Sequence, residues 1–367
     1  ITALHLAEGK GVIDMLLNAG ADIHARDTSG KTPLHFLASQ TNISTCALLS
    51  RGADVNAVDT KGQTPLHRLS TMKDDPNLVI FMVGKGANIH ARTLKGKTPL
   101  HLAAQRGRFH MTHALISLGA RCDMKSANGM STITFAAANG HASTASLIVR
   151  QGIDVNSTDR IGQGPLHYAA FKGKIAVVQV LLCAGASPVA RTHKGKSSLD
   201  IAIQNKHTAV AMAMMKVNFD FSSGDSLGRT PLHHAVTNGL VDVAHALVKT
   251  GVDFTARDMG GMTPLDLSAL RGEESIVEML LREGVNACGV DQEGWTALHF
   301  AAKKGNVAIS RSLIGAGADP TVRNARQVSP LDIAVTSGFI PLTRVMIDSG
   351  ADVRVADTSG FTALHLA

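Results

Sequence analysis

Residues 96–103 read Gly-Lys-Thr-Pro-Leu-His-Leu-Ala, and variants of this stretch recur along the whole chain. The position of Thr98 is occupied in successive copies by Thr2, Thr32, Thr64, Thr98, Ser131, Gly164, Ser197, Thr230, Thr263, Thr296, Ser329 and Thr362. The first copies are 30, 32 and 34 residues apart, and the later ones follow every 33 residues. A sequence that repeats with this period is typical of a solenoid, in which small structural units stack one after another.

Each letter of the repeated stretch has a structural reason. The hydroxyl of Thr98 suits the residue that caps a helix start, and Pro99 suits the first helical position, where no N–H donor is needed. Gly96 allows the positive φ of a tight turn before the helix. Leu100 is then the first core residue of a short first helix, which we expect to end near an interhelix glycine such as Gly107.

A second helix is predicted to follow and to end at Gly-Ala-Asp, as at residues 52–54, because glycine is the favoured left-handed residue after a helix. The next residues, such as 55–59, are expected to extend as a finger into the following turn. No unit of this kind can bury its apolar faces alone, so stability must come from stacking on neighbouring units.

The letters T-P-L-H-x-A at residues 98–103 resemble the motif of ankyrin repeats, and the resemblance covers essentially the whole chain. It implies an all-α ankyrin-repeat solenoid of helix-turn-helix units with β-hairpin-like fingers. We expect a single domain over residues 1–367, with about eleven repeats and the start of a twelfth. The resemblance also implies a scaffold for protein–protein interaction that binds its partner in a concave groove lined by fingers and first helices.

Several places depart from the repeat. Gln327 replaces the turn glycine, which predicts a strained or differently shaped turn. The first repeat lacks three residues around positions 8–11, which predicts a short first helix, and the third repeat carries an irregular segment at residues 70–77. The seventh repeat has a Met-rich second helix and Asn218 in place of the capping glycine. We therefore expect a weak seam near residues 216–224, or else only a variant repeat there.

The bulk composition predicts an intracellular protein. The four cysteines, Cys46, Cys122, Cys183 and Cys288, show no C-x-x-C spacing and are expected to stay reduced, which favours a cytoplasmic location. No apolar run approaches the roughly 18 residues that span a bilayer. The chain starts and ends inside a repeat, so we expect a fragment of a longer array whose other domains could place it in the nucleus or at a membrane.

The 17 histidines invite a metal or catalytic interpretation, which the repeat argues against. Eight of them are the fourth letter of the motif: His5, His35, His67, His101, His167, His233, His299 and His365. A ring at this position can hydrogen-bond the backbone of the helix start and the turn, and Asp200, Asp266, Asp332 or Thr134 can make similar local bonds. His110 and His113 lie three apart, but no further zinc ligand is near in sequence. Neither a metal nor a cofactor is expected.

Catalysis is not expected either. The sequence holds no G-x-x-x-x-G-K-[ST] phosphate loop, no G-x-S-x-G elbow and no H-E-x-x-H helix, and its glycines are accounted for by the repeat turns. We therefore expect no enzyme activity and no small-molecule substrate.

Positive charge is concentrated in the middle of the chain. Residues 85–200 carry 15 basic and 4 acidic side chains, whereas the whole chain has a net charge of +7. The basic residues that we expect on fingers and exposed first-helix positions are Lys95, Lys97, Arg106, Arg160, Lys172, Lys194 and Lys196. They form a solvated surface, a groove for an acidic segment of a partner protein, or a site for phosphoinositides or nucleic acid. Single-stranded nucleic acid is disfavoured because the chain has one Trp and one Tyr for base stacking.

Apolar finger residues gather in the last third of the chain. The residue between the turn glycine and the Thr position is Met262, Trp295 and then Phe361 in three of these repeats. Such residues should be at least partly exposed and could anchor a partner, or they could fold against the neighbouring finger. With the basic patch, they suggest an extended ligand with an acidic part and an apolar part.

Asn56 is a candidate for asparaginyl hydroxylation. Ankyrin-type repeats are substrates of a hydroxylase that favours a Leu six residues before Asp-Val-Asn, and Leu48 precedes Asp54-Val55-Asn56 in this way. Ile148 with Asn156 fits less well. Alternatively, the Asn side chain only stabilises the finger turn.

We therefore predict a protein-binding module whose basic fingers attract an acidic extended segment and whose apolar fingers near Trp295 hold a second part of it. Binding of polyanions, such as phosphoinositide headgroups or nucleic acid, and a mechanical or spacer role in a larger protein remain open as alternatives.

Overall fold

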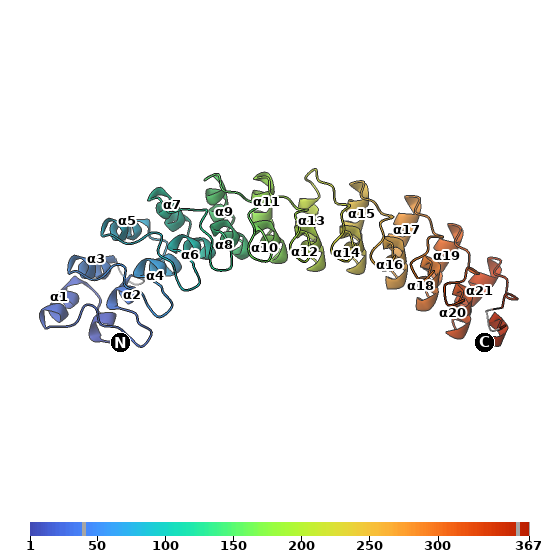
Figure 1. Cartoon of the computed structure of the whole chain (residues 1–367), viewed down its shortest axis with the longest axis horizontal. Helices are drawn as coiled ribbons and strands as arrows, with labels where there is room; N and C mark the ends of the chain where they lie inside the picture. The colour runs from blue at the N-terminus through green and yellow to red at the C-terminus, as the bar shows by residue number, and fades with distance from the viewer. Residues whose placement is uncertain (39–41, 357–359, 367) are drawn as a thin grey trace. The chain divides into compact units, whose positions relative to one another are not determined.

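The computed structural model describes residues 1–38, 42–356 and 360–366, and the ordered elements in these ranges are helices. Two compact units divide the chain, Ile1–Ser187 and Pro188–Ala367. Each unit is a stack of helix-turn-helix repeats, as the sequence predicts (Figure 1).

Unit 1 contains six helix pairs. Its first helices are the 3₁₀ helix η1 (Ala3–Leu6), α2 (Pro33–Leu37), α4 (Pro65–Met72), α6 (Pro99–Arg106), α8 (Thr132–Asn139) and α10 (Pro165–Phe171). Its second helices are α1 (Lys10–Asn18), α3 (Asn42–Ser50), α5 (Pro76–Gly84), α7 (Phe109–Ser117), α9 (Ala142–Val149) and α11 (Ile175–Cys183). The short η1 confirms the prediction of a short first helix in the first repeat.

Unit 2 continues the same pattern. Its first helices are α12 (Ser198–Gln204), α14 (Pro231–Thr237), α16 (Pro264–Arg271), α18 (Ala297–Lys304), α20 (Pro330–Thr336) and α22 (Ala363–Leu366). Its second helices are α13 (Thr208–Met214), α15 (Val241–Lys249), α17 (Glu274–Arg282), α19 (Val307–Gly315) and α21 (Ile340–Asp348).

Within each unit, first helices pack on first helices and second helices on second helices. In unit 1, α4, α6, α8 and α10 form one row and α5, α7, α9 and α11 form a second row (Figure 1). The Leu column of the motif lies at the centre of this packing: Leu34, Leu66, Leu100, Ile133 and Leu166 are all buried. Because each of these side chains is covered by neighbouring repeats, burial couples one repeat to the next.

The fingers are the segments that join a second helix to the next first helix, such as residues 85–98. Each finger turn is closed by a backbone pair, as between Thr93 and Lys97, and neighbouring turns are joined, as when the N–H of Ala127 donates to the carbonyl of Lys95 at 3.0 Å. A Cβ atom on Gly96 would lie 2.7 Å from the nitrogen of Ala127, so this contact between turns requires glycine. Short bridges such as Lys125 with Ser131 are the only β-type pairing in the described residues.

The turn at Gln327 keeps the shape of the glycine turns. Gln327 has a φ of 58°, in the left-handed region, which confirms the predicted strain. Lys206 stands at the interhelix turn of the seventh repeat, where other repeats have glycine, and also has a φ of 58°. Asn218, in contrast, does not take the left-handed conformation of the glycine that it replaces, so this repeat ends its second helix differently.

The irregular segment of the third repeat has a capping role. Asp75 precedes α5 and accepts the N–H of Leu78 at 3.0 Å, and Pro76 takes the first helical position as expected. Asp74 reaches the following repeat, where its carboxylate accepts the N–H groups of Met111 at 2.6 Å and His110 at 3.3 Å. The segment therefore caps the starts of two successive second helices.

The predicted seam at residues 216–224 does not coincide with the division between the two units, which falls after Ser187. Those residues have no regular secondary structure, and the segment follows the Met-rich helix α13. Whether they open more easily than their surroundings stays a prediction.

Candidate functional site

A buried histidine ties many of the first helices to the fingers on either side. In α6, Nδ1 of His101 accepts the N–H of Thr98 at 3.0 Å, and Nε2 donates to the carbonyl of Met124 in the next finger at 2.9 Å. An Nδ1 that accepts a hydrogen bond carries no proton, so the ring is the neutral Nε2–H tautomer. The equivalent bridge to the following finger is made by His5, His35, His67, His233 and His299.

Burial keeps these rings neutral. It lowers the pKa of His67 and of His101 to about 4, because desolvation penalises the charged ring more than the nearby carbonyl acceptors favour it. The rings lie one repeat apart and are occupied by backbone groups. They hold the fingers in register and present no shared ligand geometry.

In two of the three repeats where Asp replaces the histidine, an arginine completes the bridge. Arg191 forms an ion pair of 3.1 Å with Asp200 and donates to the carbonyl of Ser223 in the next finger. Arg323 and Asp332 repeat this arrangement with an ion pair of 2.8 Å. The interpretation of Asp as a local substitute is therefore supported, although Asp200 and Asp332 pair with arginines that the sequence interpretation did not identify. Asp266 bonds only Thr263 at its own helix start and forms no ion pair within the described ranges.

The basic candidates of unit 1 lie on fingers and at first-helix ends, as predicted. Lys95, Arg106, Arg160 and Lys172 are exposed, and Lys97 is partly exposed. Burial, and then the like charges of Lys95 and Arg106, lower the pKa of Lys97, so these three cations share one region. Within the described ranges, none of the five forms an ion pair with a carboxylate.

Lys97 is held in place by its own repeat and by the next one. Its Nζ donates to Oε1 of Gln105 at 2.9 Å and lies 4.6 Å from the ring centroid of Phe135. In unit 2, Lys196 donates to Oε1 of Gln204 in the same way at 2.7 Å. Lys194 is exposed, and Lys196 is partly exposed. The arrangement positions one ammonium group at the base of each of these two fingers.

The apolar candidates all lie in unit 2. Trp295 stacks on Phe300 with ring centroids 5.2 Å apart, and Lys303 lies 5.3 Å from its ring centroid, so the indole packs on its own first helix. Part of Trp295 stays exposed, as does part of Met262, and Phe361 is exposed. The indole Nε1 is buried and has no acceptor.

Asn56 is engaged in a finger contact. Its side-chain amide donates to the carbonyl of Gly86 at 2.9 Å, and its Oδ1 accepts the N–H of Asn88 at 2.8 Å. Asn156 makes the equivalent pair of bonds with Gly185 and Ser187. The residue is nevertheless exposed, so hydroxylation of Asn56 stays a prediction.

Comparison with protein families identifies the repeat. The model for ankyrin repeats in three copies matches overlapping segments at residues 4–93, 34–126, 69–159, 100–192, 166–258 and 255–324. The chain belongs to the ankyrin-repeat family. A comparison with curated proteins found no match.

Ankyrin repeats are generally protein–protein interaction modules and are typically not enzymes. No helix among the described ankyrin repeats is both long and apolar enough to cross a bilayer. In residues 1–38, 42–356 and 360–366, no three His, Cys, Asp or Glu side chains gather as a metal site would require.

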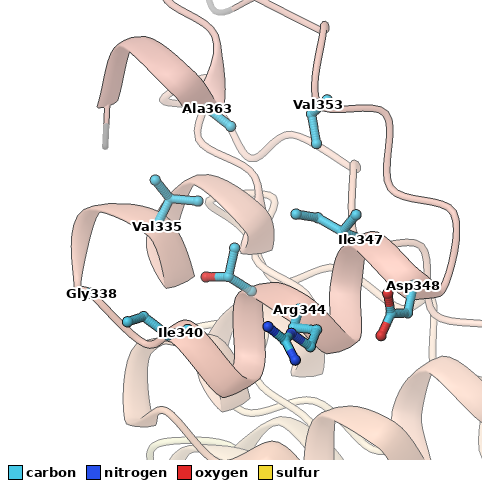
Figure 2. A pocket seen from close by; sticks show the side chains of 9 residues that line it. Val335, Gly338, Ile340, Arg344, Ile347, Asp348, Val353 and Ala363 are labelled. Carbon is cyan, nitrogen blue, oxygen red and sulfur yellow. The ribbon is translucent and has the colours of Figure 1, made fainter.

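A groove of about 730 Å³ lies beside α20 and α21 of this ankyrin array (Figure 2). Val335, Ile340, Ile347 and Val353 line it, with Arg344 and Asp348 at its side (Figure 2). The earlier second helices cover one another, α17 by α19 and α19 by α21. The lining is therefore what the stacking face of a repeat presents, and it holds few polar groups to orient a small ligand.

Two features of the ankyrin fingers were missed by sequence interpretation. The glutamines that hold Lys97 and Lys196 lie eight residues further along and gave no signal alone. Many finger turns begin with aspartate, as at Asp59, whereas two begin with Thr93 and Thr192. This replacement was visible in the sequence, but only a column-by-column comparison of the finger turns would have found it.

Proposed function

We propose that this ankyrin array binds an extended acidic segment of a partner protein along its finger face, by which we mean the finger turns together with the exposed ends of the first helices. The observation that carries the proposal is the unneutralised charge on this face. Lys95, Lys97, Arg106, Arg160, Lys172, Lys194 and Lys196 have no carboxylate partner in the described part of the chain.

Some arginines of the array do have carboxylate partners. Arg121 pairs with Asp123 at 2.7 Å, and Arg229 with Asp225 at 3.2 Å. A face that keeps several cations close together without counter-charges attracts an anionic partner and speeds its association. Arg106 and Lys95 are exposed for this contact, whereas Lys97 is held ready by Gln105.

The apolar fingers supply the second part of the proposal. Trp295 is packed on one side by Phe300 and is partly exposed, so a partner residue can cover it with little reordering of the ring. We expect binding of an acidic peptide with an apolar end to change the fluorescence of Trp295, the only Trp in the chain. Trp295→Ala should weaken the binding of this peptide and leave the binding of a purely acidic peptide unchanged.

The test is equilibrium binding of a fluorescein-labelled Glu-Ser repeat peptide, with a Gln-Ser repeat peptide as the uncharged control. The first variant changes Lys95, Lys97, Lys194 and Lys196 to Glu, which should abolish binding. The matched control changes Lys10, Lys85, Lys216 and Lys249 to Glu, because these exposed lysines lie at the ends of second helices. This control has the same net charge and should retain most of the affinity.

Equal loss in both variants would mean that net charge alone attracts the peptide, and the finger face would not be the site. Tighter binding of double-stranded DNA or of phosphoinositide vesicles than of the peptide, with a steep salt dependence, would favour a polyanion site instead. No saturable binding of any probe would favour the spacer role. Proteins captured from lysate by the wild type and lost by the first variant would then be sequenced as partners.

A further inference from the structure

The finger turns of this chain share one design with a few exceptions. The first residue of the turn is aspartate at Asp27, Asp59, Asp159, Asp225, Asp258 and Asp291, and it is Thr93, Ser126, Thr192 or Asn324 in the other described turns. In the aspartate turns, Oδ1 accepts the N–H groups of the residues two and four positions later, as Asp59 does from Lys61 and Gln63 at 2.8 Å each. Each of these turns therefore carries a carboxylate.

Two turns have lost the carboxylate and gained a pair of lysines. Residues 93–97 read Thr-Leu-Lys-Gly-Lys, and residues 192–196 read Thr-His-Lys-Gly-Lys. The Thr93 hydroxyl accepts the N–H of Lys97 at 3.1 Å, and Thr192 accepts that of Lys196 at 3.2 Å. The N–H of the intervening lysine, Lys95 or Lys194, receives no acceptor within the described ranges. No other described finger turn has lysine at both positions.

A turn that keeps its aspartate shows what the carboxylate does to a neighbouring cation. In the turn at residues 225–229, Oδ2 of Asp225 lies 3.2 Å from the guanidinium of Arg229, which occupies the position of Lys97 and Lys196. The replacement of aspartate by threonine therefore leaves Lys97 and Lys196 without the counter-charge that Arg229 has in its turn.

The two lysine turns also match in how they hold one ammonium group. Lys97 is bonded to Gln105, and Lys196 to Gln204, eight residues further along in both repeats. Lys95 and Lys194 extend into solvent beside them. Each turn thus offers one bonded and one exposed ammonium group, which is a suitable pair of donors for the two oxygens of a carboxylate.

We propose that the turns at residues 93–97 and 192–196 are two equivalent carboxylate-binding sites, each taking one acidic side chain of the partner segment between its two lysines. This inference rests on the proposed function and adds the contacts that individual acidic side chains of the partner make. Arg160 and Lys172, which lie outside these turns, then contribute long-range attraction and little to the bound contacts.

The test restores the carboxylate that the array uses elsewhere. Thr93→Asp and Thr192→Asp place aspartate where six other described turns carry it, so the fold should tolerate both substitutions. Asn324→Asp is the matched control, because it adds the same charge to the same turn position in a finger without a lysine pair. Binding of the fluorescein-labelled Glu-Ser repeat peptide is measured by anisotropy.

Each single aspartate variant should raise the Kd of the peptide several-fold, and the double variant should raise it by about tenfold or more. Asn324→Asp should bind as the wild type. Thr93→Asn and Thr192→Asn form a neutral comparison, because Asn324 shows that asparagine makes both turn bonds, at 2.9 and 3.0 Å. The double asparagine variant should also bind as the wild type, which separates the effect of charge from that of turn geometry.

Wild-type affinity in the double aspartate variant would overturn the proposed sites. If the four lysine-to-glutamate changes still abolish binding in that case, the finger face remains the binding surface and only the assignment of carboxylates to the two turns is wrong. If they do not, the proposed function fails as well. Equal weakening by the asparagine and aspartate variants would also overturn the inference, since turn geometry and not charge would then be responsible. If phosphoinositide vesicles displace the peptide from the wild type, the lysines would be assigned to phosphate binding and the inference would be overturned.

Discussion

At the scale of single residues, the array depends on polar groups that are buried and fully bonded. His101 shows the principle, since one ring closes the start of its own helix and holds the next finger through Met124. A buried ring in this position stabilises two repeats at once, and its removal leaves the N–H of Thr98 without an acceptor. The high number of histidines is therefore a consequence of the fold.

His101→Ala should destabilise the repeats around α6 by about 2–4 kcal/mol, because it deletes two buried hydrogen bonds and leaves a cavity. The measurement is the opening free energy of α6 and α8 amides from native-state hydrogen exchange. His113→Ala, at an exposed position of α7, is the control and should change these values little. Equal effects of the two substitutions would contradict the bridging role.

The same rings predict loss of stability in mild acid. His67 and His101 have a pKa of about 4 when folded against an ordinary value of 6.5, so between these pH values the unfolded chain binds more protons. Stability should therefore fall as pH drops from about 6.5 toward 4. Burial instead raises the pKa of Asp266 to about 6 from 3.8, so its contribution to the stability of α16 increases as pH falls from about 6 toward 4.

Hydrogen exchange at pH 7 and pH 5, corrected for intrinsic rates, should show α6 losing more opening free energy than α16. An unchanged or larger value for α6 at pH 5 would mean that the histidines are charged in the folded state, and the neutral bridge would be wrong.

Backbone strain gives a third prediction at this scale. Gln327 has a φ of 58°, and this backbone conformation is higher in free energy for a residue with a side chain than for glycine. Gln327→Gly should stabilise unit 2 by about 1 kcal/mol, since relief of strain exceeds the added freedom of the unfolded chain. Gln292→Gly, in the preceding finger and without a positive φ, should destabilise it instead. A loss of stability in both variants would contradict the strain.

At the scale of elements, the departures from the repeat are compensated by neighbouring residues. The segment before α5 lacks a glycine turn, and its two aspartates cap α5 and α7. Capping across repeats adds a polar link to the apolar stacking of second helices. It also couples the third repeat to the fourth in a direction that the repeat motif does not describe.

Asp74→Ala should lower the free energy of unfolding by about 1 kcal/mol, because the N–H of Met111 loses its acceptor. It should also speed the hydrogen exchange of the first amides of α7. The control is Asp123→Asn, which breaks an exposed pair with Arg121 and should cost little. An effect spread over the whole of unit 1, with no excess at α7, would contradict a local cap.

The sequence predicts these elements well because the motif encodes them locally. Thr98, Pro99 and Leu100 cap, start and anchor α6 as their chemistry requires. Contacts between repeats are harder to predict, since the pairing of Lys97 with Gln105 depends on how a finger lies over its helix. The candidate cations were found from charge alone, but the distinction between the lysine turns and the other basic positions required the geometry of the aspartate turns.

At the scale of the whole molecule, the chain consists of two compact units, and the seam that the sequence predicts lies inside the second one. Segment 216–224 follows a helix rich in methionine, which packs without strongly specifying geometry, and it lacks the usual capping glycine. We expect its amides to open at lower free energy than those of α17 and α19. Protection equal to that of these two helices would show that the segment is only a variant repeat.

The central claim for the whole molecule is that the finger face, and not the second-helix face, binds an acidic partner. The most direct measurement is a hydrogen-exchange footprint of the array saturated with the Glu-Ser repeat peptide. We predict slowed exchange at residues 93–97 and 192–196, including the free amides of Lys95 and Lys194, and no change in the second helices α7 and α9. Protection of the second helices with unchanged exchange in both lysine turns would contradict the account.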